Sequence, residues 1–174
     1  ANPGKANYAT SGAGTVPHFA GVLLSQAAGV PMTHVAYRGG APAAQDLIGG
    51  QIPLMVDTAS ETLEHHRAGK VRIVAVTGEA RSKTLPDVPT LKELGLNVAA
   101  DAFFGLYGPA GMAADVSGRL DKAVADALKA PDVQDKIFGF GLVPNHANGP
   151  ALAAAQLAHY RRWEAPVKAS GFKA

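Results

Sequence analysis

The fold of this chain is decided by the segment Asn7-Tyr8-Ala9-Thr10-Ser11-Gly12-Ala13-Gly14-Thr15 near its N-terminus. Its first four residues favour a short strand, and the glycines that follow predict a tight loop. Thr15 is suited to cap a helix whose apolar residues keep helical spacing as far as Gly29. A strand that passes through a glycine loop into a helix is typical of α/β folds with a parallel sheet.

The same order of strand, loop and helix recurs along the chain. A second strand is expected at His34–Tyr37, followed by the loop Arg38–Gly40 and a helix that ends at Gly49. Further strands are expected at 54–56, 71–77 and 103–107, an irregular excursion at 81–89, and further helices at 60–68, 91–95, 114–129, 132–138 and 150–168. The pattern predicts a parallel-rich sheet flanked by helices, with a helical C-terminal part that has to pack on another surface.

Composition excludes several classes of protein. The 174 residues are 47% hydrophobic and 17% charged, which supplies apolar material for a core and argues against intrinsic disorder. A net charge of +2, without a run of like charges, gives no basis for nucleic-acid binding. The absence of cysteine excludes a disulfide scaffold and a thiolate metal site, and leaves the cytosol and the periplasm equally open.

Neither a membrane span nor a secretory signal is indicated by the sequence. No segment is apolar for long enough to cross a bilayer. The first residues lack an apolar signal segment and an initiating methionine. We therefore expect the chain to be processed or to be part of a longer one.

Three loops follow expected strands and should meet at one edge of the sheet: Ser11–Thr15, Gly39–Ala41 and 57–60. The first two combine glycines, which let a ligand approach the backbone, with a helix N-terminus, whose N–H groups favour an anion. Both are equally compatible with plain strand-to-helix turns. Asp57 suits either a ligand hydroxyl or ammonium group or a helix cap. His18, in the first helical turn, suits a capping or supporting role.

Motifs of other chemistries are incomplete. The sequence after Gly12-Ala13-Gly14 lacks the third glycine and the acidic residue of a dinucleotide fingerprint, and no Walker A ending is present. No pair of histidines has metal-ligand spacing, and no Gly-x-Ser-x-Gly elbow occurs. We therefore expect no metal, no cofactor and no catalytic residue.

Several segments together resemble the tripartite tricarboxylate transporter substrate-binding proteins, also called Bug-type solute receptors. No single segment is specific, but they follow the family's order across essentially the whole chain. They are Asn2-Pro3-Gly4-Lys5, Asn7-Tyr8, Ser11-Gly12-Ala13-Gly14-Thr15 with His18, His34-Val35-Ala36-Tyr37-Arg38-Gly39-Gly40-Ala41-Pro42, Asp46-Leu47, Gly49-Gly50-Gln51, Met55-Val56-Asp57, Ala68-Gly69-Lys70, Ala75-Val76-Thr77, Arg81-Ser82, Leu85-Pro86-Asp87-Val88-Pro89-Thr90, Phe104-Gly105-Leu106 and Gly108-Pro109-Ala110-Gly111.

The resemblance implies a fold similar to type II periplasmic binding proteins, with two hinged α/β lobes that close on a small carboxylate. Residues 1–100 would then form the second, ligand-binding lobe. Residues 101–174 would return to the first lobe as mostly helical structure. The N-terminal part of the first lobe is expected to lie outside this sequence, and two copies of the chain could pair through the lobe interface left exposed.

The resemblance also implies a function and a site. The chain would be a periplasmic receptor, and not an enzyme, that captures a di- or tricarboxylate or an acidic amino acid for membrane permease subunits. Backbone N–H groups and hydroxyls of two loops would hold the carboxylate, and an aspartate would read its distal substituent. With the nearby histidine, the candidate ligand-binding residues are Ser11, Gly12, Ala13, Gly14, Thr15, His18, Gly39, Gly40, Ala41 and Asp57. The alternative is an α/β enzyme that binds a phosphorylated substrate or nucleotide at the same glycine loops.

Overall fold

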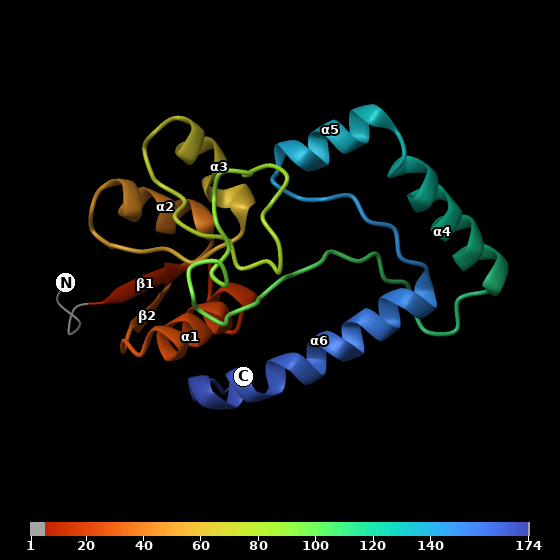
Figure 1. Cartoon of the computed structure of the whole chain (residues 1–174). Helices are drawn as coiled ribbons and strands as arrows, with labels where there is room; N and C mark the ends of the chain where they lie inside the picture. Colours follow the sequence, from red (N-terminus) through yellow and green to blue (C-terminus); the bar gives the residue numbers. More distant parts are fainter. Residues whose placement is uncertain (1–5, 174) are drawn as a thin grey trace.

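The computed structural model describes residues 6–173 and divides them into an α/β part and a helical arm (Figure 1). The segment Asn2–Lys5 that contributes to the family resemblance lies outside the described residues. The elements, in chain order, are β1 (Asn7–Thr10), α1 (Val16–Ala28), β2 (Thr33–Ala36), α2 (Gly40–Ile48), α3 (Ala59–Arg67), α4 (Ala114–Ala127), α5 (Pro131–Gly139) and α6 (Gly149–Ser170).

The sheet is parallel, as the alternation of strands and helices predicts. β1 pairs with β2 in parallel, with Asn7 opposite Thr33 and Thr10 opposite Ala36. The strand expected at 54–56 is reduced to a single parallel bridge between Ala9 and Met55. Ala9 donates its N–H to the carbonyl of residue 54 at 2.8 Å, and its carbonyl accepts the N–H of residue 56 at 2.9 Å. β1 therefore lies between its two neighbours.

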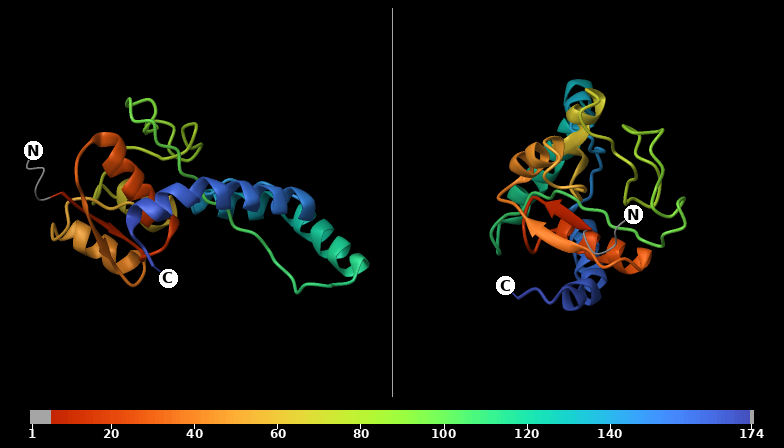
Figure 2. Two further views of the ribbon diagram at one scale, coloured as in Figure 1. Left: turned by 90° about the horizontal axis from the view of Figure 1, so that it is seen from below. Right: turned by 90° about the vertical axis from the view of Figure 1, so that its left-hand side faces the viewer.

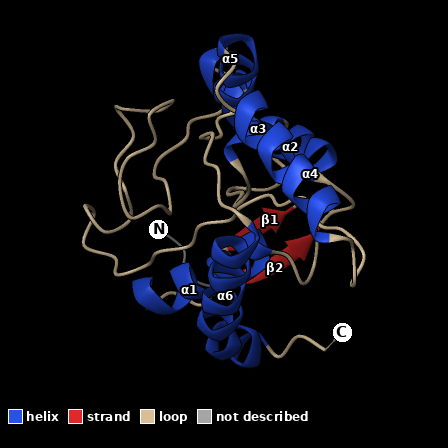
Figure 3. Cartoon of the chain, turned by 90° about the vertical axis from the view of Figure 1, so that its right-hand side faces the viewer, coloured by secondary structure: helices blue, strands red, loops and turns tan. Residues whose placement is uncertain are grey.

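Helices cover both faces of this sheet. α1 and α6 lie on one face and α2 and α3 on the other (Figures 1 and 3). Successive side chains of a strand point to opposite faces, so Tyr8, 1% exposed, meets α1, whereas the fully buried Ala9 packs with Ala43 of α2 and with Ile52. The predicted ends of α1 are confirmed: Thr15 is its N-cap, and Gly29 ends it in the left-handed conformation, at φ 63°.

Two expected strands and one expected helix are absent from the described residues. The runs 71–77 and 103–107 form no strand, and the first makes only one bridge, between Val76 and Thr90. Their side chains favour strands, but a strand also needs a neighbour with which to pair. Within 91–95, Glu93 and Thr90 cap each other's backbone N–H groups, yet only a turn forms. The irregular excursion is confirmed, and it packs Leu85 and Val88 against α3.

α4, α5 and most of α6 form an arm beside the α/β part (Figure 2), and the chain directly after α5 returns to α3, with Gly141 beside Ala59. No residue of α4 or α5 is buried, and Pro166 is the one buried residue within α6. The C-terminal half of α6 packs on α1, where the Phe19 and Trp163 rings lie 6.2 Å apart. Large apolar side chains exposed on the arm and on the segment before it are Phe103, Phe104, Leu106, Tyr107, Leu120, Phe140, Val143, Leu157 and Tyr160.

None of the helices in the described part of the chain combines the length and hydropathy that a membrane span requires.

Candidate functional site

Asp57 joins the bridge at 54–56 to the loop after β1. Its Oδ2 accepts the backbone N–H of Ser11 at 2.8 Å, and its Oδ1 accepts the Ser11 hydroxyl at 3.0 Å. Oδ1 also accepts the N–H of Thr58 at 2.8 Å, directly before α3. The carboxylate therefore satisfies donors from two of the three loops that the sequence places at one edge.

The third loop joins the same edge through the backbone. Gly39, the residue before α2, donates its N–H to the carbonyl of Ser11 at 3.0 Å, and Tyr37 donates to Thr10 at 3.0 Å. Ser11 is consequently bonded to all three loops. The prediction that they meet at one edge of the sheet is confirmed, because Ser11, Gly39 and Asp57 are directly hydrogen-bonded.

The segment Ser11–Thr15, called the glycine loop below, is closed by its own hydroxyl groups. The Thr15 hydroxyl donates to the carbonyl of Gly12 at 2.8 Å and accepts the N–H of His18 at 3.4 Å, which caps α1. Thr10 lies on the other side, where its Oγ1 accepts the N–H of Gly12 at 3.3 Å. The loop is therefore held in one conformation by short-range hydrogen bonds.

Gly14 is required by the fold itself. Its φ of 75° lies in the left-handed region, where side chains are strained. A Cβ at this position would also lie 2.6 Å from the ring of Phe172, which reaches the loop from the C-terminus. The interpretation of the glycines as turn residues thus has a structural basis at Gly14.

His18 lies behind the loop. It is 7% exposed, and its Nδ1 accepts the N–H of Gly14 at 3.2 Å. The supporting role that its sequence position favours agrees with this geometry. Its ring stacks on that of His34, with the centroids 4.0 Å apart and the planes inclined by 18°.

Burial shifts the titration of this aromatic group. Burial lowers the pKa of His18. Burial, together with the charge of a protonated His18, lowers the pKa of His34 from 6.5 to about 4. Burial raises the pKa of Tyr8 to about 12, and its hydroxyl donates to the carbonyl of His18 at 3.1 Å. All three side chains are therefore neutral near pH 7.

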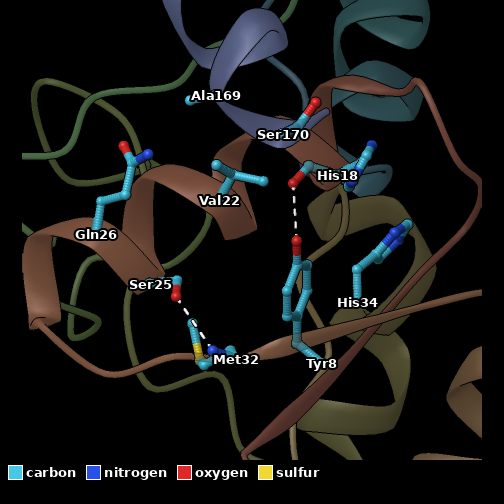
Figure 4. A pocket seen from close by; sticks show the side chains of 9 residues that line it. All are labelled: Tyr8, His18, Val22, Ser25, Gln26, Met32, His34, Ala169 and Ser170. Atoms are coloured by element: carbon cyan, nitrogen blue, oxygen red, sulfur yellow. Dashed lines mark hydrogen bonds between the residues drawn. The ribbon is translucent and has the colours of Figure 1, made fainter. Parts of the chain in front are cut away.

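A hollow of ≈ 350 Å³ lies beside the two histidines, between the sheet, α1 and the end of α6 (Figure 4). Its lining residues are Tyr8, His18, Val22, Ser25, Gln26, Met32, His34, Ala169 and Ser170. Apart from the two histidines and the tyrosine, these side chains are not titratable. The hollow lies on the α1 face of the sheet, behind the glycine loop.

At the start of α2 the structure brings in a residue that the sequence analysis missed. Gly40 is buried, and a Cβ there would lie 2.2 Å from a carboxylate oxygen of Glu61, in the first turn of α3. Its neighbour Ala41 is exposed. Glu61 follows Asp57 closely in the sequence, which is the one signal that could have indicated it.

The edge presents the N-termini of α1 and α2, which suit recognition of an anion. The N–H groups of Ser11, Gly12, Gly14 and Gly39 and the hydroxyls of Ser11 and Thr15 already have partners within the chain. Neither α1 nor α2 has an acidic residue of its own in the first turn. Among the residues that the structure describes, no group of three His, Cys, Asp or Glu side chains could hold a metal ion.

Comparison with known proteins identifies the family. The model of the tripartite tricarboxylate transporter family receptor, TctC, matches residues 1–172. A UPF0065 protein from the tcbD–tcbE intergenic region of Pseudomonas sp. strain P51 is 34% identical over 167 residues, which are 94% of this chain and 49% of that protein. The chain thus spans about half the length of that relative.

Solved structures of the same type share the fold. The structure of R. palustris Rpa4515 with adipate has a TM-score of 0.88 at 28% identity, covering 95% of this chain and 56% of that one. MatC (Rpa3494) from Rhodopseudomonas palustris with bound malate has a TM-score of 0.79 at 32% identity, covering 93% of this chain and 56% of that one. The family resemblance and the α/β periplasmic-binding-protein fold are confirmed, and the family is one of solute-binding receptors rather than enzymes. The chain belongs to the tripartite tricarboxylate transporter receptor family of periplasmic solute-binding proteins.

Proposed function

We propose that this chain is the carboxylate-binding part of an extracytoplasmic receptor, which captures a small di- or tricarboxylate or an acidic amino acid. In this proposal the receptor works in the periplasm and delivers its ligand to the membrane subunits of a tripartite tricarboxylate-type transporter. The observation that carries the proposal is the convergence of three loops on Ser11, which places the N-termini of α1 and α2 at one edge. The adipate and malate bound to two structural relatives support the ligand class.

The ligand carboxylate would lie between the glycine loop and Gly39–Ala41. Both helices direct N–H groups and the positive end of the helix dipole toward this edge. Neither helix has an acidic residue in its own first turn, and the Glu61 carboxylate of α3 lies beside Gly40 at the start of α2. Each charge-assisted hydrogen bond contributes about 1.5–3 kcal/mol, and a micromolar Kd corresponds to about 8 kcal/mol. A few such bonds, together with the exclusion of water, would therefore reach the micromolar range.

Asp57 would set specificity from the same edge. Its two oxygens already accept hydrogen bonds from Ser11 and Thr58. A carboxylate has about four lone-pair positions, so it can still accept a bond from a ligand hydroxyl or ammonium group. In that role it both fixes the loops and reads the distal end of the ligand.

The helical arm supports a division into two lobes. We propose that residues 1–100 belong to the second lobe and residues 101–174 to the first. α4 and α5 bury none of their residues, and apolar side chains such as Leu120 and Phe140 are exposed on them. In relatives of about twice this length, further first-lobe structure would cover such a surface. Pairing of two copies of this chain stays a prediction, which native mass spectrometry would test.

The substitution Ala41→Asp tests the site. Ala41 is exposed in the first turn of α2, where an added carboxylate favours the helix but repels a bound anion. We expect adipate or malate to bind at least about tenfold more weakly, equivalent to 1.4 kcal/mol, in isothermal titration calorimetry. Ala151→Asp, in the first turn of α6, is the matched control and should leave the affinity unchanged. An unaltered affinity in Ala41→Asp would exclude the α2 N-terminus from the site.

A further inference from the structure

Two stacked histidines support the glycine loop, His18 directly and His34 through Thr10. His18 accepts the N–H of Gly14 on its Nδ1 at 3.2 Å. His34 Nε2 lies 2.7 Å from Thr10 Oγ1, which in turn accepts the N–H of Gly12 at 3.3 Å. Two backbone N–H groups of the loop are therefore held, directly or through one hydroxyl, by the same pair of rings.

We propose that this histidine pair is a proton-sensitive support of the glycine loop, so that acidification loosens the loop and weakens carboxylate capture. The part that concerns capture rests on the proposed function. The part that concerns the loop stands on the hydrogen bonds alone, and His18 and His34 act as positioning residues.

Protonation removes the bond to Gly14. The neutral His18 ring accepts this bond with an unprotonated Nδ1 and carries its proton on Nε2. When Nδ1 takes up a proton, two N–H donors face each other, and the contact is lost. The stacked rings, 4.0 Å apart, also disfavour two positive charges at once. Acid therefore releases the Gly14 amide from its present partner.

The groups described around the two histidines do not titrate in the same pH range. From β1 the group that faces it is Tyr8, whose ring lies 5.1 Å from that of His34 and whose hydroxyl stays neutral because burial raises its pKa to about 12. From the C-terminus the edge of the Phe172 ring meets His18. The residues of α1, β2 and α6 that line the adjoining hollow carry no further acidic or basic side chain. That hollow offers protons a route to the rings (Figure 4).

The direction of the effect follows from burial. The pKa of His18 is lowered, so the ring is neutral at pH 7 and its bond to Gly14 is complete there. Protonation sets in below the ordinary histidine value of 6.5. The loop should therefore loosen as the pH falls below this value, and not at neutral pH.

The first part of the test measures, by NMR, the hydrogen-exchange protection factor of the Gly14 amide. This factor is corrected for the pH dependence of intrinsic exchange. We expect wild-type protection to fall at least about tenfold between pH 7.5 and pH 4.5. His18→Asn keeps an acceptor near the Nδ1 position that does not titrate, so its protection should be independent of pH. His18→Leu has no acceptor and should be poorly protected at every pH. His66→Asn is the matched control, because His66 Nδ1 accepts a backbone N–H from Ile73 at 3.3 Å, away from the loop.

The second arm measures adipate binding by calorimetry at the same pH values. Protonation of adipate itself affects all variants equally. The association constant of the wild type divided by that of His18→Asn therefore reports the effect of protein protonation alone. We expect this quotient to decrease over the same pH range in which the Gly14 amide loses protection. The loop proposal would be overturned if the protection factor of the Gly14 amide in the wild type did not change with pH. It would also be overturned if His18→Asn lost this protection in acid as the wild type does. If neither adipate nor malate bound at pH 7.5, the proposed function would be overturned, and so would the claim that acid weakens carboxylate capture. The NMR measurement would still decide whether acid loosens the glycine loop.

Discussion

The substitution Asp57→Asn should measure how strongly the carboxylate of Asp57 holds the glycine loop to the start of α3. In the native chain its Oδ2 accepts one backbone N–H from Ser11, and its Oδ1 accepts the Ser11 hydroxyl and the N–H of Thr58. Asparagine has almost the same shape but only one acceptor oxygen. Whichever way its amide is turned, its NH₂ group faces a backbone N–H that was previously bonded.

The expected loss follows from these contacts. One charge-assisted hydrogen bond is removed, and a partly buried backbone donor loses its partner, which together cost about 2 kcal/mol of the free energy of unfolding. A chain of 150–250 residues loses roughly 2–4 °C in Tm for each 1 kcal/mol. Asp57→Asn should therefore unfold about 4–8 °C below the wild type.

Thermal and urea unfolding, followed by circular dichroism without ligand, provide the assay. Asp135→Asn, on the exposed side of α5, is the control with the same chemical change, and it should stay within about 0.5 kcal/mol of the wild type. If Asp57→Asn were as stable as this control, the carboxylate would not hold the loops, and its three short contacts would have no energetic meaning.

Three further substitution or titration series address the packing around the loop. The pKa of His34 is lowered to about 4, so below pH 6.5 the unfolded chain binds more protons than the folded one. In urea unfolding, the contribution of His34 to the free energy of unfolding should be complete above pH 6.5 and should be lost toward pH 4. The loss should be no more than about 3 kcal/mol, because solvent that reaches the ring reduces it. His34→Phe should lose most of this slope, and an unchanged slope would contradict the assignment. Gly14→Ala should lower the free energy of unfolding by about 1–3 kcal/mol, because its Cβ would be strained and would meet the ring of Phe172. Adding Phe172→Ala should recover part of that loss, whereas an equal loss in both backgrounds would refute the clash. Gly21→Ala should destabilise the chain by about 1–3 kcal/mol, because its Cβ would lie 2.0 Å from a buried tyrosine ring. Gly118→Ala faces open space in α4 and should stabilise the chain by about 0.5–1 kcal/mol. Thermal melts in which both variants shifted Tm in the same direction would contradict the described packing.

Local signals predicted the local structure well. Thr15 and Gly29 mark the ends of α1 because capping and left-handed turns depend on neighbouring residues alone. The parallel pairing of β1 and β2 also followed from the order of elements, because a helix between two strands returns the chain in the same direction.

Elements that depend on a distant partner were predicted poorly. The run 71–77 is rich in β-branched residues, yet it makes one bridge, and Val74 is 58% exposed. Phe104, at the centre of another expected strand, is 80% exposed. Residue preference indicates that such a run fits a sheet, but pairing is decided by which other segment lies beside it. The cap at Thr90 likewise marks a helix start, but the left-handed Gly95 ends the segment after a turn.

The candidate site shows the same division. The meeting of its three loops was predictable, because the carboxyl ends of parallel strands share an edge. The contacts that complete it were not, since Glu61 over Gly40 and Phe172 over Gly14 join residues far apart in the sequence. The stacking of His18 and His34 was missed for the same reason.

An NMR titration of the ¹⁵N-labelled chain with adipate and malate tests the central claim most directly, with ATP and NAD as controls of another ligand class. The account predicts that the carboxylates shift the backbone amides of Gly12–Thr15 and Gly39–Ala41 most, leave α4 and α5 unchanged, and that the nucleotides have no effect. Shifts confined to other parts of the chain, or produced only by the nucleotides, would contradict a carboxylate site between the N-termini of α1 and α2.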